Sequence, residues 1–284
     1  MLIDYHMHFE YGSYDEEWVK GFFESAKKNK VEEIGISEHS HGFTEFKKLY
    51  YKELDLRPNT LVGDFQEKWL AKNKFKCSIN DYENFINTLK AKSYPVKFAI
   101  EVCNFQDQES VEEILKKHNF DYIIASVHFI DGWGFDASLI KENFSNYNLM
   151  DLYEKYTIEI EKLANTKLYD ILGHPFNIRV FGNIPSENID HLLERAVIAL
   201  KNSNMAIDIN TGSKYRYPIR EISPFNRFMY FAQKYDLDIV LSSDAHKPED
   251  CGKYIEEASE YAKSFGFEYL TVFNQRQREK ILLK

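Results

Sequence analysis

Two histidines at the end of the first apolar run are the first residues that could do chemistry. The run begins at Leu2 and ends in His-x-His, with imidazoles at His6 and His8. In an extended strand, residues i and i+2 point to the same face, so both rings would project together. Two adjacent imidazoles are half of a transition-metal site. Alone the pattern is a weak signal, and the metal hypothesis depends on the later strands.

Similar residues follow each later predicted strand except the last short one. They are Glu38, His39, Glu101, His128, His174, Asn210, Asp244 and His246. Taken singly, each has a structural alternative: a strand-end histidine is often only hydrogen-bonded, Glu101 could cap a helix, and Asp244 could be an N-cap. Taken together, six imidazoles and the carboxylates of Glu101 and Asp244 on one rim would be costly without cations, because unpaired buried charge is unfavourable.

The donor set is nitrogen and oxygen without thiolate, which favours Zn, Mn or Fe over Cu⁺ or a cysteine-type zinc site. The donors outnumber the needs of one ion, so we expect two or three divalent metal ions. Closely spaced metals suit phosphoester hydrolysis, because they neutralise phosphoryl charge and lower the pKa of a bridging water.

Strands and helices alternate along the chain. Strands are expected over 2–8, 31–37, 95–101, 121–128, 169–174, 205–210, 239–243 and 269–274. Helices are expected over 14–29, 80–92, 110–118, 148–165, 188–202, 224–235 and 258–265, which leaves His118 and His191 on helices, away from the rim. This alternation indicates an α/β fold with parallel βαβ units, and seven such strands suit a barrel whose C-terminal rim carries the chemistry.

No Gly/Ser/Pro-rich linker divides the sequence, so one domain over 1–284 is expected. The segment 43–94 is different, being polar and rich in Lys, Tyr and Phe. Apart from the helix over 80–92, we expect it to be a long excursion that partly covers a site.

Composition excludes several functions. The formal net charge of −9 argues against non-specific nucleic-acid binding, which needs clustered basic residues. No apolar window is long enough to span a membrane, and we expect no signal peptide, because no basic stretch followed by an apolar stretch begins the sequence. Cys77, Cys103 and Cys251 are scattered without a CxxC pair, so a cytoplasmic location is expected.

The motifs, in this order, resemble the PHP (polymerase and histidinol phosphatase) family. They are Asp4–His8, Ser37–His39, Ile100–Glu101, Ser126–His128, Gly173–Pro175 and Ser243–His246. The aromatic segment 126–136 resembles that of the monofunctional histidinol-phosphate phosphatases.

The resemblance implies a distorted (β/α)₇ barrel with a trinuclear metal centre and a small phosphorylated substrate, L-histidinol phosphate. It implies that one ion is held by His6, His8, Glu101 and Asp244, a second by Glu101, His128 and His174, and a third by His39 and His246. The family usually adds a histidine shortly after His-x-His, and this sequence has none there. Either Glu10 replaces it as a ligand, or the third site is weak or partly held by water.

Further roles are hypotheses. Asp244 or His246 would pass a proton to the leaving alkoxide. Glu38 would orient His6 or a water, and His41 would contact substrate or be exposed to solvent.

Arginines would bind the phosphate, with Arg179 ranked before Arg216 and Arg220, although each could be a plain surface residue. Trp133, Phe135 and Asp136 would contact the imidazole and amine of the substrate, and Phe135 could equally be core.

Three alternatives remain open: a PHP phosphoesterase for another metabolite or a nucleotide, an amidohydrolase-like enzyme, and a non-catalytic module such as the PHP domains of some polymerases. The second normally needs a bridging lysine where this chain has Glu101, and the third would lack ligands that are nearly all present here.

Overall fold

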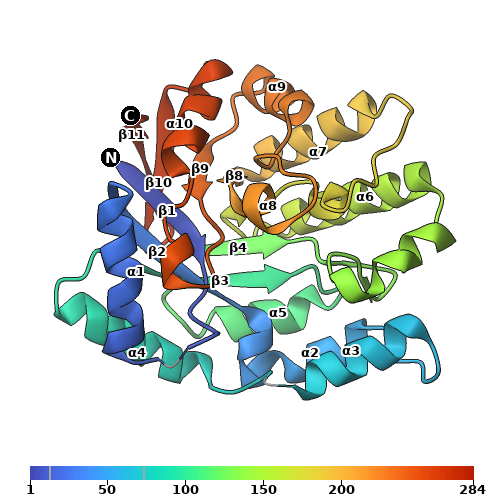
Figure 1. Cartoon of the computed structure of the whole chain (residues 1–284), viewed down its shortest axis with the longest axis horizontal. Helices are drawn as coiled ribbons and strands as arrows, with labels where there is room; N and C mark the ends of the chain where they lie inside the picture. The colour runs from blue at the N-terminus through green and yellow to red at the C-terminus, as the bar shows by residue number, and fades with distance from the viewer. Residues whose placement is uncertain (13, 73) are drawn as a thin grey trace.

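Seven parallel strands form the centre of the molecule (Figure 1). The computed structural model describes residues 1–12, 14–72 and 74–284, so position 73 of the predicted excursion lies outside the described residues. In sheet order the strands are β1 (Leu2–Met7), β2 (Val31–His39), β3 (Val96–Cys103), β4 (Tyr122–Ser126), β7 (Ile171–Leu172), β8 (Ala206–Asn210) and β9 (Ile239–Ser242). The sheet curves until its two edges meet, where the His8 amide donates to the Ala245 carbonyl at 2.8 Å. The predicted distorted (β/α)₇ barrel is therefore confirmed.

Helices connect and cover these strands at the predicted places. They are α1 (Glu16–Lys28), α4 (Ile79–Ala91), α5 (Gln108–Leu115), α6 (Leu149–Thr166), α7 (Asp190–Ser203), α9 (Asn226–Lys234) and α10 (Ile255–Ser264). Side-chain caps fix several starts: Asp15 accepts from the Trp18 amide at 2.8 Å, and Ser78 forms a capping box with Asp81. Burial of one apolar face then holds each helix against the sheet.

The excursion contains two helices that the sequence did not predict, α2 (Lys47–Glu53) and α3 (Leu61–Ala71), which lie along one edge of the molecule (Figure 1). Buried Gln66 belongs to the inner face of α3 and obscures its apolar pattern. Its amide donates to the carbonyls of Asp55 (2.8 Å) and Gly132 (3.0 Å) and accepts from the Gly134 amide (2.7 Å). A polar side chain therefore joins this helix to the barrel rim.

Short elements complete the rim. They are a hairpin of β5 (Phe129–Ile130) and β6 (Trp133–Gly134), the helix α8 (Gly212–Arg216), and the 3-10 helices η1 (Ser40–Gly42), η2 (Thr44–Phe46), η3 (Ser138–Asn146), η4 (Asn177–Arg179) and η5 (Pro248–Asp250).

A C-terminal hairpin of β10 (Tyr269–Asn274) and β11 (Gln277–Leu282) packs at the opposite end of the barrel. The Gln275 amide donates to Asp121 at 3.1 Å, and Arg276 pairs with Asp170 at 2.9 Å. These two aspartates immediately precede β4 and β7, so the hairpin covers the N-terminal ends of the strands and leaves the chemical rim free. The sequence predicted β10 but not β11.

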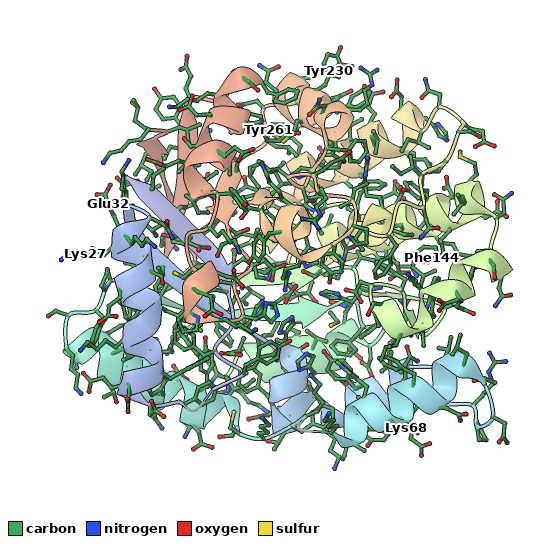
Figure 2. The ribbon with its side chains drawn as sticks, in the orientation of Figure 1. Lys27, Glu32, Lys68, Phe144, Tyr230 and Tyr261 are labelled. Atoms are coloured by element: carbon green, nitrogen blue, oxygen red, sulfur yellow. The ribbon has the colours of Figure 1, made fainter. Side chains whose placement is uncertain are left out.

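Large aromatic side chains fill the core. Tyr122 stacks on Tyr5 with ring centroids 4.9 Å apart and donates to the Tyr5 carbonyl at 2.6 Å. A Cβ at Gly35 would lie 1.6 Å from the Tyr122 hydroxyl, so this strand position must be glycine. Charged residues such as Lys27 and Lys68 lie at the periphery (Figure 2). None of the helices within the described ranges is long and apolar enough to cross a membrane.

Candidate metal centre

Glu101 lies at the centre of the residues that the strands bring together. Its Oε1 is 3.1 Å from His128 Nε2 and 3.0 Å from His174 Nε2. Its Oε2 is 3.3 Å from His6 Nε2 and 3.1 Å from His39 Nε2. The two oxygens thus face separate pairs of imidazoles, an arrangement suited to a carboxylate that bridges two cations.

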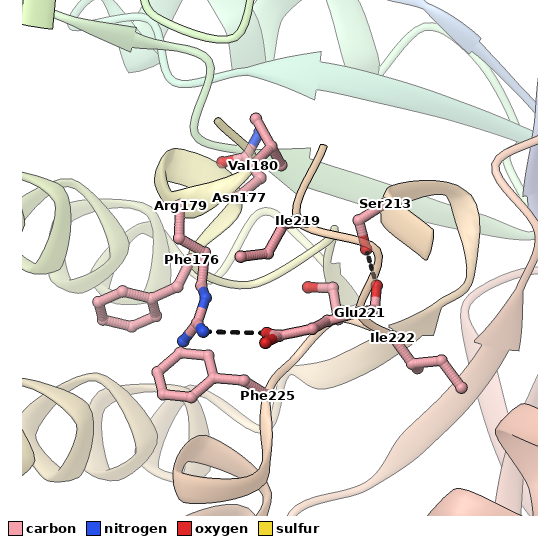
Figure 3. Close-up of a pocket in the computed structure, with 10 residues that line it drawn as sticks. Phe176, Asn177, Arg179, Val180, Ser213, Ile219, Glu221, Ile222 and Phe225 are labelled. Carbon is pink, nitrogen blue, oxygen red and sulfur yellow. Dashed lines mark hydrogen bonds and ion pairs between the residues drawn. The ribbon is translucent and has the colours of Figure 1, made fainter. Parts of the chain in front are cut away.

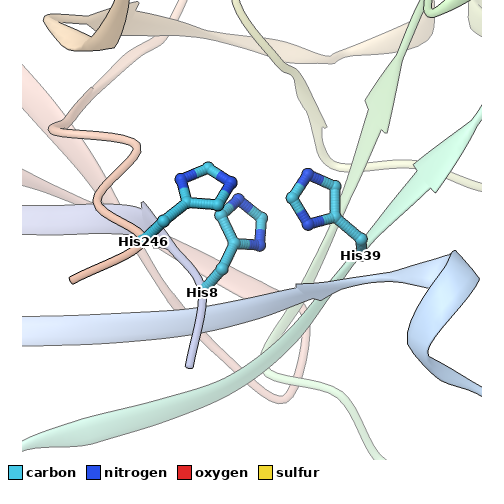
Figure 4. A group of neighbouring side chains, drawn as sticks. All are labelled: His8, His39 and His246. Atoms are coloured by element: carbon cyan, nitrogen blue, oxygen red, sulfur yellow. The ribbon is translucent and has the colours of Figure 1, made fainter. Parts of the chain in front are cut away.

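The remaining predicted ligands gather beside His6. His8 Nε2 lies 3.4 Å from Asp244 Oδ1. The His8 ring is 3.7 Å from that of His39 and 4.5 Å from that of His246, measured between centroids (Figure 4). The structure therefore places imidazoles from the residue after β1, from β2 and from the segment after β9 side by side.

The donor atoms fit divalent cations. Several buried atoms have no hydrogen-bond partner within the described residues, namely His6 Nε2, His8 Nδ1 and Nε2, His39 Nδ1, His41 Nδ1, His174 Nδ1 and Glu101 Oε2. Groups of three ligand atoms lie within 4.8 Å of one another, and their residues are His6/Glu101/His174, His6/His8/Asp244, His8/His39/His246 and Glu10/His39/His41. Burial lowers the pKa of His8 to about 4, so its ring is neutral near pH 7 and can offer a lone pair.

Two carboxylates orient imidazoles from behind. Asp208 Oδ2 is 2.7 Å from His6 Nδ1, and Asp136 Oδ2 is 2.6 Å from His128 Nδ1. Each contact directs Nε2 towards Glu101, as carboxylate–histidine pairs do at metal sites. Sequence reasoning missed Asp208. The residue lies two positions before Asn210 on the same strand, so its side chain could have been expected on the same face as that of Asn210. It named Asp136 only as a substrate contact.

Two other buried carboxylates position the backbone. Asp4 accepts from the amides of Ser243 and Gly252, both at 2.8 Å, and joins the first strand to the last; burial raises its pKa to about 6. Glu38 accepts from the Phe9 amide at 2.5 Å. The expectation that Glu38 orients His6 was wrong, because Asp208 holds that position.

Glu10 faces the outer side of the cluster. Its Oε2 lies 3.5 Å from His39 Nδ1 and 3.7 Å from His41 Nδ1, and its Oε1 lies 3.8 Å from His246 Nε2. His41 is only 7% exposed, so the alternative of a solvent-exposed residue was wrong. Each of these separations is somewhat longer than the roughly 3.3 Å between two ligand atoms on one tetrahedral zinc ion.

A pocket of about 80 Å³ opens beside the cluster. It is lined by His39, His128, Asp136, His174, Asn177, Val180, Asn210, Ser213, Arg216, Tyr217, Asp244 and His246. The Arg216 guanidinium contacts the Asp244 carboxylate and donates to His246 Nδ1 at 2.7 Å. Although burial opposes ionisation, Arg216 keeps the pKa of Asp244 well below its usual range.

Arg179 lies in a neighbouring pocket rather than in this one (Figure 3). Its guanidinium pairs with Glu221 at 2.9 Å and stacks 3.8 Å from the centre of the Phe225 ring. The sequence ranked Arg179 ahead of Arg216 as the phosphate ligand, and the structure places only Arg216 in the pocket beside the cluster. Arg220 is likewise outside that pocket.

Trp133 does not reach the cluster. Its ring is 1% exposed and stacks on Tyr147 with centroids 5.3 Å apart. Phe135 is also fully buried. The predicted contact of Trp133 with substrate is therefore corrected to a packing role, because the β5–β6 hairpin turns this side chain towards η3.

The chain resembles known proteins in sequence. The sequence profile of the PHP domain matches residues 4–212. A probable histidinol-phosphatase of Deinococcus radiodurans is 29% identical over 172 residues, which cover 61% of this chain and 65% of that protein. One of Thermotoga maritima is 25% identical over 167 residues, which cover 58% and 64%. The matched part thus spans just under two thirds of the length of these relatives.

Solved structures share the fold. A histidinol phosphate phosphatase of Lactococcus lactis, in complex with zinc, L-histidinol and phosphate, has a TM-score of 0.70 at 19% identity and covers 98% of this chain and 99% of that one. A putative histidinol phosphatase of Listeria monocytogenes has a TM-score of 0.69 at 18% identity, with coverage of 90% and 99%. Because the PHP domain profile matches well over half of the sequence, the chain belongs to the PHP domain family.

Proposed function

We propose that this chain is a metal-dependent phosphomonoesterase that hydrolyses L-histidinol phosphate to L-histidinol and phosphate. The observation that carries the proposal is the position of Glu101. Its two oxygens face separate pairs of imidazoles, next to a pocket lined by Arg216. The names of the curated relatives support the choice of substrate.

The proposed ligand sets are those that the resemblance to the PHP family implies, with Glu10 added to the third. His6, His8, Glu101 and Asp244 would hold one ion, Glu101, His128 and His174 a second, and His39, His246 and Glu10 a third. Zinc, manganese or iron there would neutralise phosphoryl charge. The ion would also lower the pKa of water, so that hydroxide is available to attack phosphorus.

Arg216 would hold the phosphoryl group, because a guanidinium matches the spacing of phosphate oxygens. On binding, its donors would turn from Asp244 and His246 to the substrate. Asp136 also lines the pocket, and the oxygen that does not contact His128 would accept from the substrate ammonium.

Proton transfer would use Asp244 and His246. The ionised Asp244 carboxylate is suited to accept a proton from the attacking water, and either group would then deliver a proton to the leaving alkoxide.

The test is phosphate release by the metal-loaded protein from L-histidinol phosphate, measured against a panel of other phosphomonoesters. We expect kcat/KM on histidinol phosphate to exceed that on every other ester by a wide margin. Slow release without discrimination would remove the substrate assignment, and no release from any ester would overturn the phosphatase proposal.

Asp244 gives a second test. We expect Asp244→Asn to lower kcat at least about a hundredfold, because the amide cannot carry the proton. Metal content is measured in parallel, and undiminished turnover with full metal content would show that Asp244 has no role in proton transfer.

A further inference from the structure

A second, larger cavity adjoins the cluster at Glu10 and His41. It has a volume of about 710 Å³, and its lining includes Trp69 and three lysines, Lys72, Lys74 and Lys76. We call it the lysine cavity. Among the described residues, its lining shares none with that of the Arg216 pocket, so the two are distinct spaces.

The backbone holds the lysine-bearing segment in place. The Phe75 amide donates to the His41 carbonyl and the Lys76 amide to the Gly42 carbonyl, both at 2.8 Å. An isolated parallel bridge between Phe43 and Cys77 continues this pairing. Residues 74–77 are therefore tied to the loop that follows β2, which places Lys74 and Lys76 in the wall of a built cavity.

The charge of the lysine cavity is unbalanced. Within the described part of the chain, no carboxylate lies within 4.0 Å of the ammonium of Lys72, Lys74 or Lys76. Glu10 is the one carboxylate among the described lining residues. Three cations face one anion there, although the whole chain carries a net charge of −9.

Lys74 is the most enclosed of the three. Its ammonium lies 4.5 Å from the centre of the Trp69 ring and 3.4 Å from His41 Nε2. Burial lowers the pKa of Lys74 because it disfavours the ammonium. An anion in the cavity would place a negative charge beside this ammonium.

We propose that the lysine cavity binds a phosphate-bearing anion, held by Lys74 and Lys76 beside the Trp69 ring. This site is additional to the reaction site and does not depend on the proposed hydrolysis. Its ligand would be either inorganic phosphate, including phosphate released by the neighbouring reaction, or a separate phosphorylated metabolite whose organic part packs on Trp69.

The probe is inorganic phosphate, titrated by equilibrium dialysis into the metal-loaded protein. We expect two separable binding phases, one for the metal centre and one for the lysine cavity. In Lys74→Gln/Lys76→Gln the second phase should weaken at least about tenfold, because hydrogen bonds between charged groups are lost.

The matched control is Lys47→Gln/Lys48→Gln, which removes the same charge from exposed positions on α2 and should keep both phases. Circular dichroism and the unfolding midpoint confirm that each variant is folded. A single phase in the unsubstituted protein, or an equal loss in both double variants, would overturn the proposal.

A competition arm separates the two sources of phosphate. Phenylphosphonate carries the same charged group on a ring and resists hydrolysis. If it displaces phosphate from the second phase at lower concentration than phosphate itself, the natural ligand is organic. If it competes no better, the site is for inorganic phosphate.

Discussion

Asp208 and Asp136 decide which way two rings of the cluster point. Both accept from an imidazole Nδ1, so the opposite nitrogen faces Glu101. We expect Asp208→Asn to weaken metal binding by about ten- to a hundredfold, because the amide fixes the His6 tautomer less strongly. Competition with a chromophoric zinc chelator measures this. Asp236→Asn, at an exposed position, should leave the affinity unchanged, and equal affinities in all three proteins would refute the positioning role.

Substitutions of Arg216 and Arg179 should affect kcat/KM differently, because the two side chains have different surroundings. Arg216 lines the pocket beside the cluster, whereas Arg179 is held by Glu221 and Phe225. We expect Arg216→Gln to lower kcat/KM about ten- to a hundredfold through the loss of charged hydrogen bonds to phosphate. Arg179→Gln should lower kcat/KM much less. Steady-state kinetics of both variants decide, and the reverse order would restore Arg179 as the phosphate ligand.

The metal ligands at the strand ends could be predicted from the sequence. A structural role can explain one histidine or carboxylate at a strand end, but not so many of them on one rim. Their partners were harder to predict. Asp208 lies within an apolar strand, and nothing in its neighbours shows that it meets His6, which is distant in sequence. Trp133 was misassigned because nearness to His128 in sequence does not fix the direction of a hairpin side chain.

Strands and long helices were predictable because each buries one face, which gives a regular apolar period. The elements that were missed lack that signal. Helix α3 buries a glutamine, and β11 (Gln277–Leu282) is largely polar because it pairs only with β10 outside the main sheet. Tertiary contacts, rather than local sequence pattern, hold both elements in place.

Gln66 provides a test of how the excursion is attached. Its amide serves one backbone group of the excursion, at Asp55, and two of the rim, at Gly132 and Gly134. We expect Gln66→Ala to lower the free energy of unfolding by about 2 kcal/mol, because buried backbone groups lose their partners. The neighbouring exposed Glu67→Ala should change it by less than about 0.5 kcal/mol. Urea unfolding measures both, and equal midpoints would show that the excursion does not depend on this side chain.

The whole molecule concentrates polar groups at one end of an otherwise apolar barrel. Imidazoles and carboxylates from β1, β2, β3 and the segments after β4, β7 and β9 converge there, and many of their buried atoms have no hydrogen-bond partner within the described residues. Such a cluster opposes folding unless cations are bound, because unsatisfied buried polar groups cost free energy. Metal binding and global stability should therefore be coupled.

Removal of metal is the measurement that follows. A ligand at a hundred times its dissociation constant stabilises the folded state by about 2.7 kcal/mol, so chelation should lower the unfolding midpoint by about 5 °C or more. In Glu101→Gln, which weakens the central bridging group, the difference between the zinc-loaded and chelated protein should shrink. Calorimetric scans of both proteins, with and without chelator, give this difference directly. If chelation shifts the two midpoints equally, the stabilising metal is bound elsewhere, because only a site that includes Glu101 can lose its contribution through this substitution.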